Sequence, residues 1–209
     1  MSYQDALYCS SATTEVEMVD EIVCDRKFLV FESSLLQLLK RCTRCGHDVQ
    51  CKTSTRGTLL VVDGSCPDGH EFHWESQPSV RGMAAGNLLV SAATLFCGLT
   101  YTRMANMAKV LNVPFLCERY FYRLQNEYIF PVIHTAYVKH QEAIFAFLKG
   151  TPLQLSGDGR CDSPGYSAKY CTCSLMDNAT DLIIDYSLVQ MTETGSSVSM
   201  ETEGLKRCL

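Results

Sequence analysis

The feature that most constrains this sequence is a pair of short motifs in which potential metal ligands lie a few residues apart. The first is Cys42-Thr-Arg-Cys45, and the second is Cys66-Pro-Asp-Gly-His70, with a glycine directly before its last candidate ligand. Tetrahedral zinc takes four such ligands, and two tight turns can each supply two of them. The spacing is typical of a zinc ribbon, in which a hairpin that includes residues 58–62 forms a small sheet. We therefore expect a structural Zn²⁺ site with all four positions filled by protein.

Other donors lie close to these motifs. His73 is the main alternative to His70 as the fourth ligand, and His47 and Cys51 are spare donors. Of the three, Cys51 has the sequence context of a buried free thiol. The alternative to a metal site is a group of reduced cysteines that pack as small apolar side chains.

The chain contains 12 cysteines in 209 residues, and those outside the two motifs show no comparable pairing. Cys171 and Cys173 lie two apart in a predicted strand, so they share one face and we interpret them as packing residues. The first residues lack the basic and apolar regions of a secretory signal, which favours a reducing compartment. The longest apolar stretch, residues 88–99, is too short to span a bilayer, so no membrane association is expected.

The middle of the sequence has helical periodicity. Apolar residues recur at helical spacing, with predicted breaks at Gly98, at residues 112–114 and at Pro131; the two clearest stripes are Leu88, Leu89, Ala92, Ala93 and Phe96, then Met104, Met107, Ala108 and Leu111. Two short helices around the second break are typical of a helix-turn-helix.

The helix after this break carries a polar face of four residues, Arg119, Tyr122, Arg123 and Asn126. Arginine can bind phosphate or guanine, and tyrosine and asparagine can add contacts to the DNA backbone or base edges. Because the net charge is −5, any DNA contact must use such a local patch. The alternative is an ordinary solvated face of a helical bundle.

After residue 150 the apolar period changes from helical to alternating. Strands are predicted near residues 153–159, 169–176 and 182–191, the last two joined by an Asp177-Asn178 turn, and a helix is predicted over 196–209. Asp158 lies between two glycines at the predicted end of the first strand, where little bulk would block a metal or a nucleic-acid backbone. The alternative is an aspartate that binds its own turn.

Several motifs resemble those of DDE-type cut-and-paste DNA transposases of animal genomes, of the Kolobok or THAP-transposase kind, and of host proteins derived from them. The resemblance covers roughly residues 35–209. The matching positions are Cys42-x2-Cys45, Gly57-Thr-Leu59, Cys66, Gly69-His70, Trp74-x-Ser-Gln-Pro78, Gly86-Asn-Leu-Leu89, residues 157–170, 174–177 and 188–190, and Met200 to Arg207.

This resemblance implies an α+β protein of several modules. These are a zinc ribbon over residues 35–80, a helix-turn-helix-like segment for DNA binding or dimerisation over 84–150, and the start of an RNase H-like catalytic domain over 151–209. It implies that Asp158, with Asp162 as its competitor, is the first catalytic acid and holds Mg²⁺ or Mn²⁺ for phosphodiester cleavage and strand transfer. The implied location is the nucleus. The implied partners are transposon-end DNA and a second copy of the chain, with no small-molecule substrate.

The sequence departs from the family pattern in two places. Residues 1–34 form an acidic leader, predicted to be disordered, that cannot supply a THAP zinc finger, and the chain ends before the elements expected to carry the second and third catalytic acids. Glu193, Glu201 and Glu203 lie too close together to replace them. We therefore expect an incomplete RNase H-like domain in a transposase-derived DNA-binding protein that is inactive alone. The alternative is a domesticated zinc-ribbon factor that binds DNA or protein without catalysis.

Overall fold

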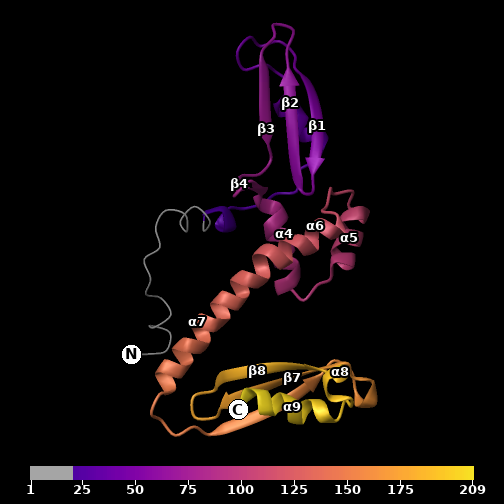
Figure 1. The fold of residues 1–209 in the computed structure, drawn as a ribbon. Coiled ribbons are helices and arrows are strands. Elements are labelled where there is room, and N and C mark those ends of the chain that lie inside the picture. Colours follow the sequence, from indigo (N-terminus) through magenta and orange to yellow (C-terminus); the bar gives the residue numbers. More distant parts are fainter. Residues whose placement is uncertain (1–20) are drawn as a thin grey trace. The chain divides into compact units, whose positions relative to one another are not determined.

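The structure of the protein is a computed structural model, and it describes residues 21–209. The chain divides into two compact units, whose described parts are residues 21–132 and 133–209. Both units contain helices and strands, so the fold is of the predicted mixed α+β class (Figure 1). Of the predicted leader, residues 1–20 lie outside the described residues. Residues 21–24 are helical, and helix α3 (Glu32–Leu38) includes the last three residues of the leader, so this part is not disordered as predicted.

A three-stranded antiparallel sheet forms the first part of the first unit. Its order is β1 (Gln50–Arg56), β2 (Leu59–Ser65) and β3 (Glu71–Glu75), so that β2 is central. The central strand buries Leu59, Val61 and Val62, whereas the flanking strands are largely exposed. A two-stranded ladder of β4 (Ser79–Val80) and β5 (Met83–Ala84) follows and leads into the helices.

The turn between β1 and β2 packs against the start of helix α4 (Ala85–Phe96) through one buried amide. The side chain of Asn87 accepts hydrogen bonds from the backbone N–H and the hydroxyl of Thr58, both at 2.8 Å, and donates to the Arg56 carbonyl at 3.0 Å. Gly57 has a φ of +67°, and a Cβ there would lie 2.5 Å from the Asn87 oxygen. Glycine is therefore required at this turn for both its backbone conformation and its size.

Helix α4 buries a different face from the one that its apolar stripe predicts. The most buried residues include the polar side chains of Asn87, Ser91 and Thr94, while Phe96, a member of the predicted stripe, is 71% exposed. The physical reason is that the hairpin turn needs hydrogen-bond partners, which Asn87 supplies. The Ser91 and Thr94 hydroxyls donate hydrogen bonds to backbone carbonyls one turn earlier in the helix, at 2.9 and 2.7 Å. Their burial therefore leaves neither hydroxyl unpaired.

The remaining helices of the first unit enclose a small aromatic core. Helix α5 (Tyr101–Val110) and helix α6 (Glu118–Leu124) are separated by residues 111–117, which confirms the predicted break at residues 112–114. Leu116, Phe121 and Leu124 form the buried cluster, and Tyr101 packs on it and donates a hydrogen bond to the Leu116 carbonyl at 3.0 Å.

The predicted break at Pro131 is wrong. Helix α6 is followed directly by a π-helical turn, η1 (Gln125–Ile129), and then by helix α7 (Phe130–Leu148), with no non-helical residue between them. Proline interrupts a regular helix because it cannot donate a backbone hydrogen bond. A wider π turn directly before Pro131 changes the bonding pattern at this point, so the chain stays helical.

The second unit contains three antiparallel strands followed by helices. The order is β6 (Leu155–Cys161), β7 (Tyr170–Asp177) and β8 (Leu182–Gln190), with β6 at one edge, and the strands precede α8 (Met191–Thr194) and α9 (Ser199–Cys208). These elements confirm the alternating pattern and the final helix predicted from the sequence. Asp177 is buried and accepts hydrogen bonds from the Gln154 N–H and the Thr180 hydroxyl, which closes the predicted turn.

Two helices cover parts of this sheet. Met200 of α9 packs with Cys171, Cys173 and Val189, whereas Ile144 and Leu148 of α7 pack with Ile184. Tyr137 of α7 donates a hydrogen bond to Asp185 at 2.8 Å and contacts the Tyr186 ring edge to face. Desolvation, together with this carboxylate, raises the pKa of Tyr137 to about 12, so its hydroxyl stays a proton donor at neutral pH.

Candidate metal centre

Four predicted ligands come from two turns that are built alike. In the first turn the Cys42 N–H bonds the His47 carbonyl, and in the second the Cys66 N–H bonds the His70 carbonyl. Each turn contains a glycine with positive φ, Gly46 at +76° and Gly69 at +77°. The second turn connects β2 to β3, so the pairing of these strands holds it in place.

The structure brings the two turns together so that their ligand atoms form one cluster. The Cys42 Sγ lies 3.7 Å from the His70 Nδ1, and the Cys66 Sγ lies 3.6 Å from both the same nitrogen and the Cys45 Sγ. A tetrahedral zinc ion with ordinary bond lengths separates sulfur and nitrogen ligands by roughly 3.5–3.8 Å. The donors therefore fit zinc in type, number and spacing.

Backbone groups already favour a thiolate at one of these positions. The N–H groups of Arg44 and Cys45 donate hydrogen bonds to the Cys42 sulfur and lower its pKa to about 6. At Cys45 the His47 N–H acts in the same direction, but desolvation and the neighbouring thiols and Asp68 outweigh it and raise the pKa to about 12. Without a cation, Cys42 is therefore the thiolate of this pair at neutral pH, and Cys45 keeps its proton.

A hydrogen bond between a histidine and an aspartate next to the cluster links the two turns. The His47 Nδ1 lies 2.8 Å from the Asp68 carboxylate, which joins the two turns, and this contact lowers the pKa of Asp68. The Asp68 carboxylate also accepts a hydrogen bond from the Cys45 thiol, and the ligand atoms of Cys45, His47 and Asp68 lie within 4.8 Å of one another. Sequence reasoning missed Asp68, although its place inside the second motif was a usable signal.

The two alternative donors lie elsewhere. His73 contacts Asp63 at 2.7 Å and Glu75 at 3.5 Å, and these two carboxylates raise its pKa. The half-buried Cys51 points its sulfur toward the Leu39 carbonyl at 3.9 Å. Among the described residues, the structure thus places His70 and not His73 in the cluster with the three cysteines.

The predicted DNA-contacting residues lie on an exposed face. Arg119, Tyr122 and Arg123 are exposed on α6, while Phe121 and Leu124 point into the core. The Arg123 guanidinium lies 4.9 Å from the Tyr120 ring and 4.0 Å from the Glu127 carboxylate, and both contacts are open to solvent.

Asn126, the fourth predicted residue of this face, is exposed as well but belongs to the π turn η1. The prediction assumed a regular α-helix through this residue, and the structure has a π turn here instead.

Asp158 does not lie at the end of a strand as predicted, but in the middle of β6, opposite Ser174. Its glycine neighbours face helix α9, since a Cβ on Gly157 would lie 3.3 Å from Leu205 and one on Gly159 would lie 2.7 Å from Glu201. Successive residues of a strand face opposite sides, so the exposed Asp158 points away from α9. The glycines therefore make room for a helix and not for a ligand of Asp158.

Asp162 has the role of a turn aspartate. Its carboxylate accepts hydrogen bonds from the N–H groups of Lys169 at 3.0 Å and Tyr170 at 3.4 Å, and these donors lower its pKa. Within residues 21–209, no group of three or more potential metal ligands includes Asp158 or Asp162. The described residues therefore do not build a Mg²⁺ or Mn²⁺ site around either acid.

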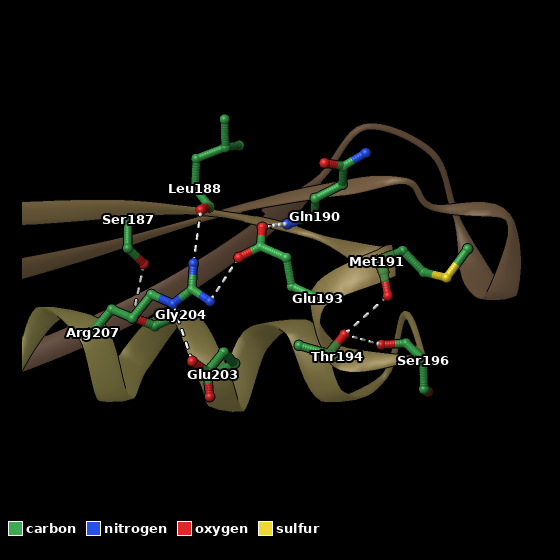
Figure 2. Close-up of polar contacts among 10 residues, drawn as sticks. All are labelled: Ser187, Leu188, Gln190, Met191, Glu193, Thr194, Ser196, Glu203, Gly204 and Arg207. Carbon is green, nitrogen blue, oxygen red and sulfur yellow. Dashed lines mark hydrogen bonds and ion pairs between the residues drawn. The ribbon is translucent and has the colours of Figure 1, made fainter.

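Two glutamates near the C-terminal end of the described chain are held in ion pairs. Figure 2 shows Arg207 between Glu193, at 2.9 Å, and Glu203, at 3.0 Å. Glu193 also accepts a hydrogen bond from the Gln190 N–H, and Arg207 also donates to the Leu188 carbonyl. This network ties α8 and α9 to β8, which is a structural role for these acids.

Within the described residues, none of the helices has both the length and the apolar character that a membrane span requires. Comparisons of the chain with protein-family models, with curated proteins and with solved structures gave no match.

Proposed function

We propose that Cys42, Cys45, Cys66 and His70 bind a structural zinc ion and that residues 35–80 are a zinc ribbon. The observation that carries this proposal is the mutual spacing of the four ligand atoms, which all lie within 4.8 Å of one another. Four protein ligands leave no position for water, so the ion stabilises the fold and does no chemistry. Its role is to hold the turn before β1 and the turn between β2 and β3 together.

We further propose that the chain is a nuclear, transposase-derived DNA-binding protein. Two features support this: the motifs shared with DDE-type transposases, and the exposure of Arg119 and Arg123 on one face of α6. A helix that presents arginines over a packed aromatic core suits contact with the phosphate backbone. Binding to another protein through the same helical segment, or to a second copy of the chain, is the alternative.

The RNase H-like assignment of residues 151–209 remains part of this proposal. Its support is the antiparallel order β6-β7-β8 followed by a helix that packs on the sheet. A catalytic cation needs several carboxylates, and the described residues gather none around Asp158. We therefore propose DNA binding through α6, and no phosphodiester cleavage by residues 151–209, as the activity of the chain.

The test is DNA binding by the zinc-loaded full chain, measured on a short fluorescent duplex of mixed sequence at several salt concentrations. The double variant Arg119→Ala/Arg123→Ala is expected to bind more weakly and to make the slope of log K against log salt less negative by about 2, since each lost phosphate contact removes about 0.9. Lys206→Ala, a change of the same sign on α9, is the control. Binding that is unaffected by the double variant, or that is absent, contradicts the DNA proposal and favours a protein partner.

A further inference from the structure

A second group of potential metal ligands lies in the other unit. The ligand atoms of Cys161, Cys171 and Glu201 all lie within 4.8 Å of one another. Cys161 and Cys171 are directly opposite each other on strands β6 and β7, and Glu201 projects from helix α9. The three residues thus bring together three separate elements of the unit.

The lack of a side chain at Gly159 makes room for the Glu201 side chain in this group. Gly159 lies two residues before Cys161 on the same face of β6, and a Cβ there would be 2.7 Å from the Cγ of Glu201. The Glu201 side chain therefore occupies the space that a larger residue would fill. Gly159 lets the glutamate lie across the sheet with its carboxylate beside the two thiols.

The group of three ligands has apolar residues on one side and solvent on the other. Cys171 is fully buried and packs with Ala168, Val189 and Met200, whereas Cys161 is half-buried and Glu201 is exposed. An ion can enter from the exposed side, while the apolar residues beneath keep the sulfur ligands dry. A shell of this kind is usual around thiolate-bound metals.

Packing accounts for the two thiols, since free cysteines fill apolar cores as small side chains. The exposed Glu201 carboxylate is open to solvent, and what packing does not account for is its position beside both thiols. Glu193 and Glu203 both pair with Arg207 (Figure 2), whereas in the described part of the chain no ion pair is formed by Glu201. Its position beside two thiols matches the donor set of zinc.

The third nearby thiol, that of Cys173, is engaged elsewhere. The Cys173 sulfur lies 3.4 Å from the Glu201 carbonyl, and a Cβ on Gly204 would lie 2.3 Å from that sulfur, so helix α9 covers it. The site therefore has three protein ligands and one position for water.

We propose that Cys161, Cys171 and Glu201 bind a zinc ion that ties helix α9 to strands β6 and β7, with water as the fourth ligand. The two thiols lose their protons to solvent as the ion binds, which gives two thiolates and one carboxylate around the cation. This site is independent of the zinc ribbon, shares no residue with it and would be the more exchangeable of the two because one of its ligands is water.

The zinc content of the purified, reduced full chain tests this proposal. The wild type is expected to hold two ions per chain, and Cys161→Ser and Glu201→Gln are each expected to hold one. Cys66→Ser should also hold one, through loss of the ribbon ion, and replacement of the exposed Cys97 by serine should leave two. One ion in the wild type, unchanged in Cys161→Ser and lost in Cys66→Ser, overturns the second site and keeps the first. The reverse pattern overturns the first and keeps the second.

A second measurement separates metal binding from a simple packing defect. Hydrogen exchange of the α9 amides, including that of Gly204, should slow when zinc is added to the wild type. Glu201→Gln, which keeps the size of an exposed side chain, should lose this response to zinc while its exchange without metal stays as in the wild type. An equal response in both proteins contradicts the proposed site.

Discussion

In the first unit, the contact between the sheet and helix α4 depends on one residue, Asn87, through its side-chain amide. It is 3% exposed and makes three hydrogen bonds to the β1–β2 turn. Gln77, just before β4, supports the same turn. Its side-chain amide donates a hydrogen bond to the Thr58 carbonyl at 2.6 Å and accepts one from the Gly86 N–H at 2.9 Å. The turn is thus held by side-chain amides where a hydrophobic contact would be expected.

Asn87→Ala is expected to lower the free energy of unfolding by about 1–3 kcal/mol, because it leaves the Thr58 N–H and the Arg56 carbonyl without their partner. Asn126→Ala, at an exposed position of the same unit, should stay within about 0.5 kcal/mol of the wild type. Denaturant unfolding of the zinc-loaded protein measures both. Equal stability of the two variants would show that the Asn87 contacts contribute nothing.

At the scale of elements, helix α9 lies close to its sheet because small residues face each other. A Cβ on Gly204 would meet the Cys173 sulfur, and Gly157 and Gly159 of β6 face the same helix. The serine hydroxyl of Ser187 donates to the Gly204 carbonyl at 2.8 Å and fixes the position of the helix along β8. The helix cannot move outward without breaking this bond.

Gly204→Ala should therefore destabilise the protein by about 1–2 kcal/mol, since the overlap with Cys173 outweighs the gain in helix propensity. Gly157→Ala is the matched control, because its new methyl would be tight only against the end of the flexible Leu205 side chain, at 3.3 Å, and in ordinary contact with Ser174 and Leu175. Its stability should stay within about 0.5 kcal/mol of the wild type. A stabilised Gly204→Ala would mean that α9 packs less closely than the structure indicates.

The ion pairs of Arg207 give the α8–α9 segment a pH dependence. The Gln190 N–H and the Arg207 guanidinium lower the pKa of Glu193 below its usual 4.5. A lowered folded-state pKa stabilises the fold at pH values above 4.5, and this contribution is lost as the pH falls through the folded-state value. The stability difference between the wild type and Glu193→Gln should thus shrink on acidification. Hydrogen exchange of β8 amides measures it, with Glu142→Gln as a control that should show no such trend.

The sequence predicts most elements but not how all of them pack. The strands β7 and β8 and the helix α9 follow from periodicity, because each has one buried face. The buried face of α4 could not be predicted, since it depends on a hairpin turn brought to Asn87 from 29 residues away. The orientation of Asp158 could not be predicted either, because it depends on where α9 packs.

The candidate centre was the more predictable feature, because both turns carry their ligands within a few residues. The choice between His70 and His73 required the structure, since it depends on the register of β2 and β3, which pairs His73 with Asp63. The second group of ligands had no sequence signal of this kind. Cys161, Cys171 and Glu201 lie on three different elements and meet only after the sheet and helix have formed.

At the scale of the whole molecule, we expect the two proposed ions to matter to different degrees for the folding of the two units. In the sheet β1–β3 the buried apolar residues are Leu59, Val61, Val62 and the ligand Cys66. We therefore expect this sheet to depend on the proposed zinc ion, because in domains with so small a core metal binding and folding are one process. The second unit has its own core around Cys171, Val189 and Met200 on one face of its sheet, and Ile144 and Ile184 in a second cluster. It should stay folded when its ion is removed.

Amide hydrogen exchange of the full chain before and after zinc chelation is the measurement that tests the zinc ribbon most directly. The amides of Val61 and Val62 in β2 are expected to be protected with zinc bound and to lose their protection when a chelator removes it, while that of Cys173 in β7 stays protected. Unchanged protection at Val61 and Val62 in the metal-free protein would contradict a structural zinc site at Cys42, Cys45, Cys66 and His70.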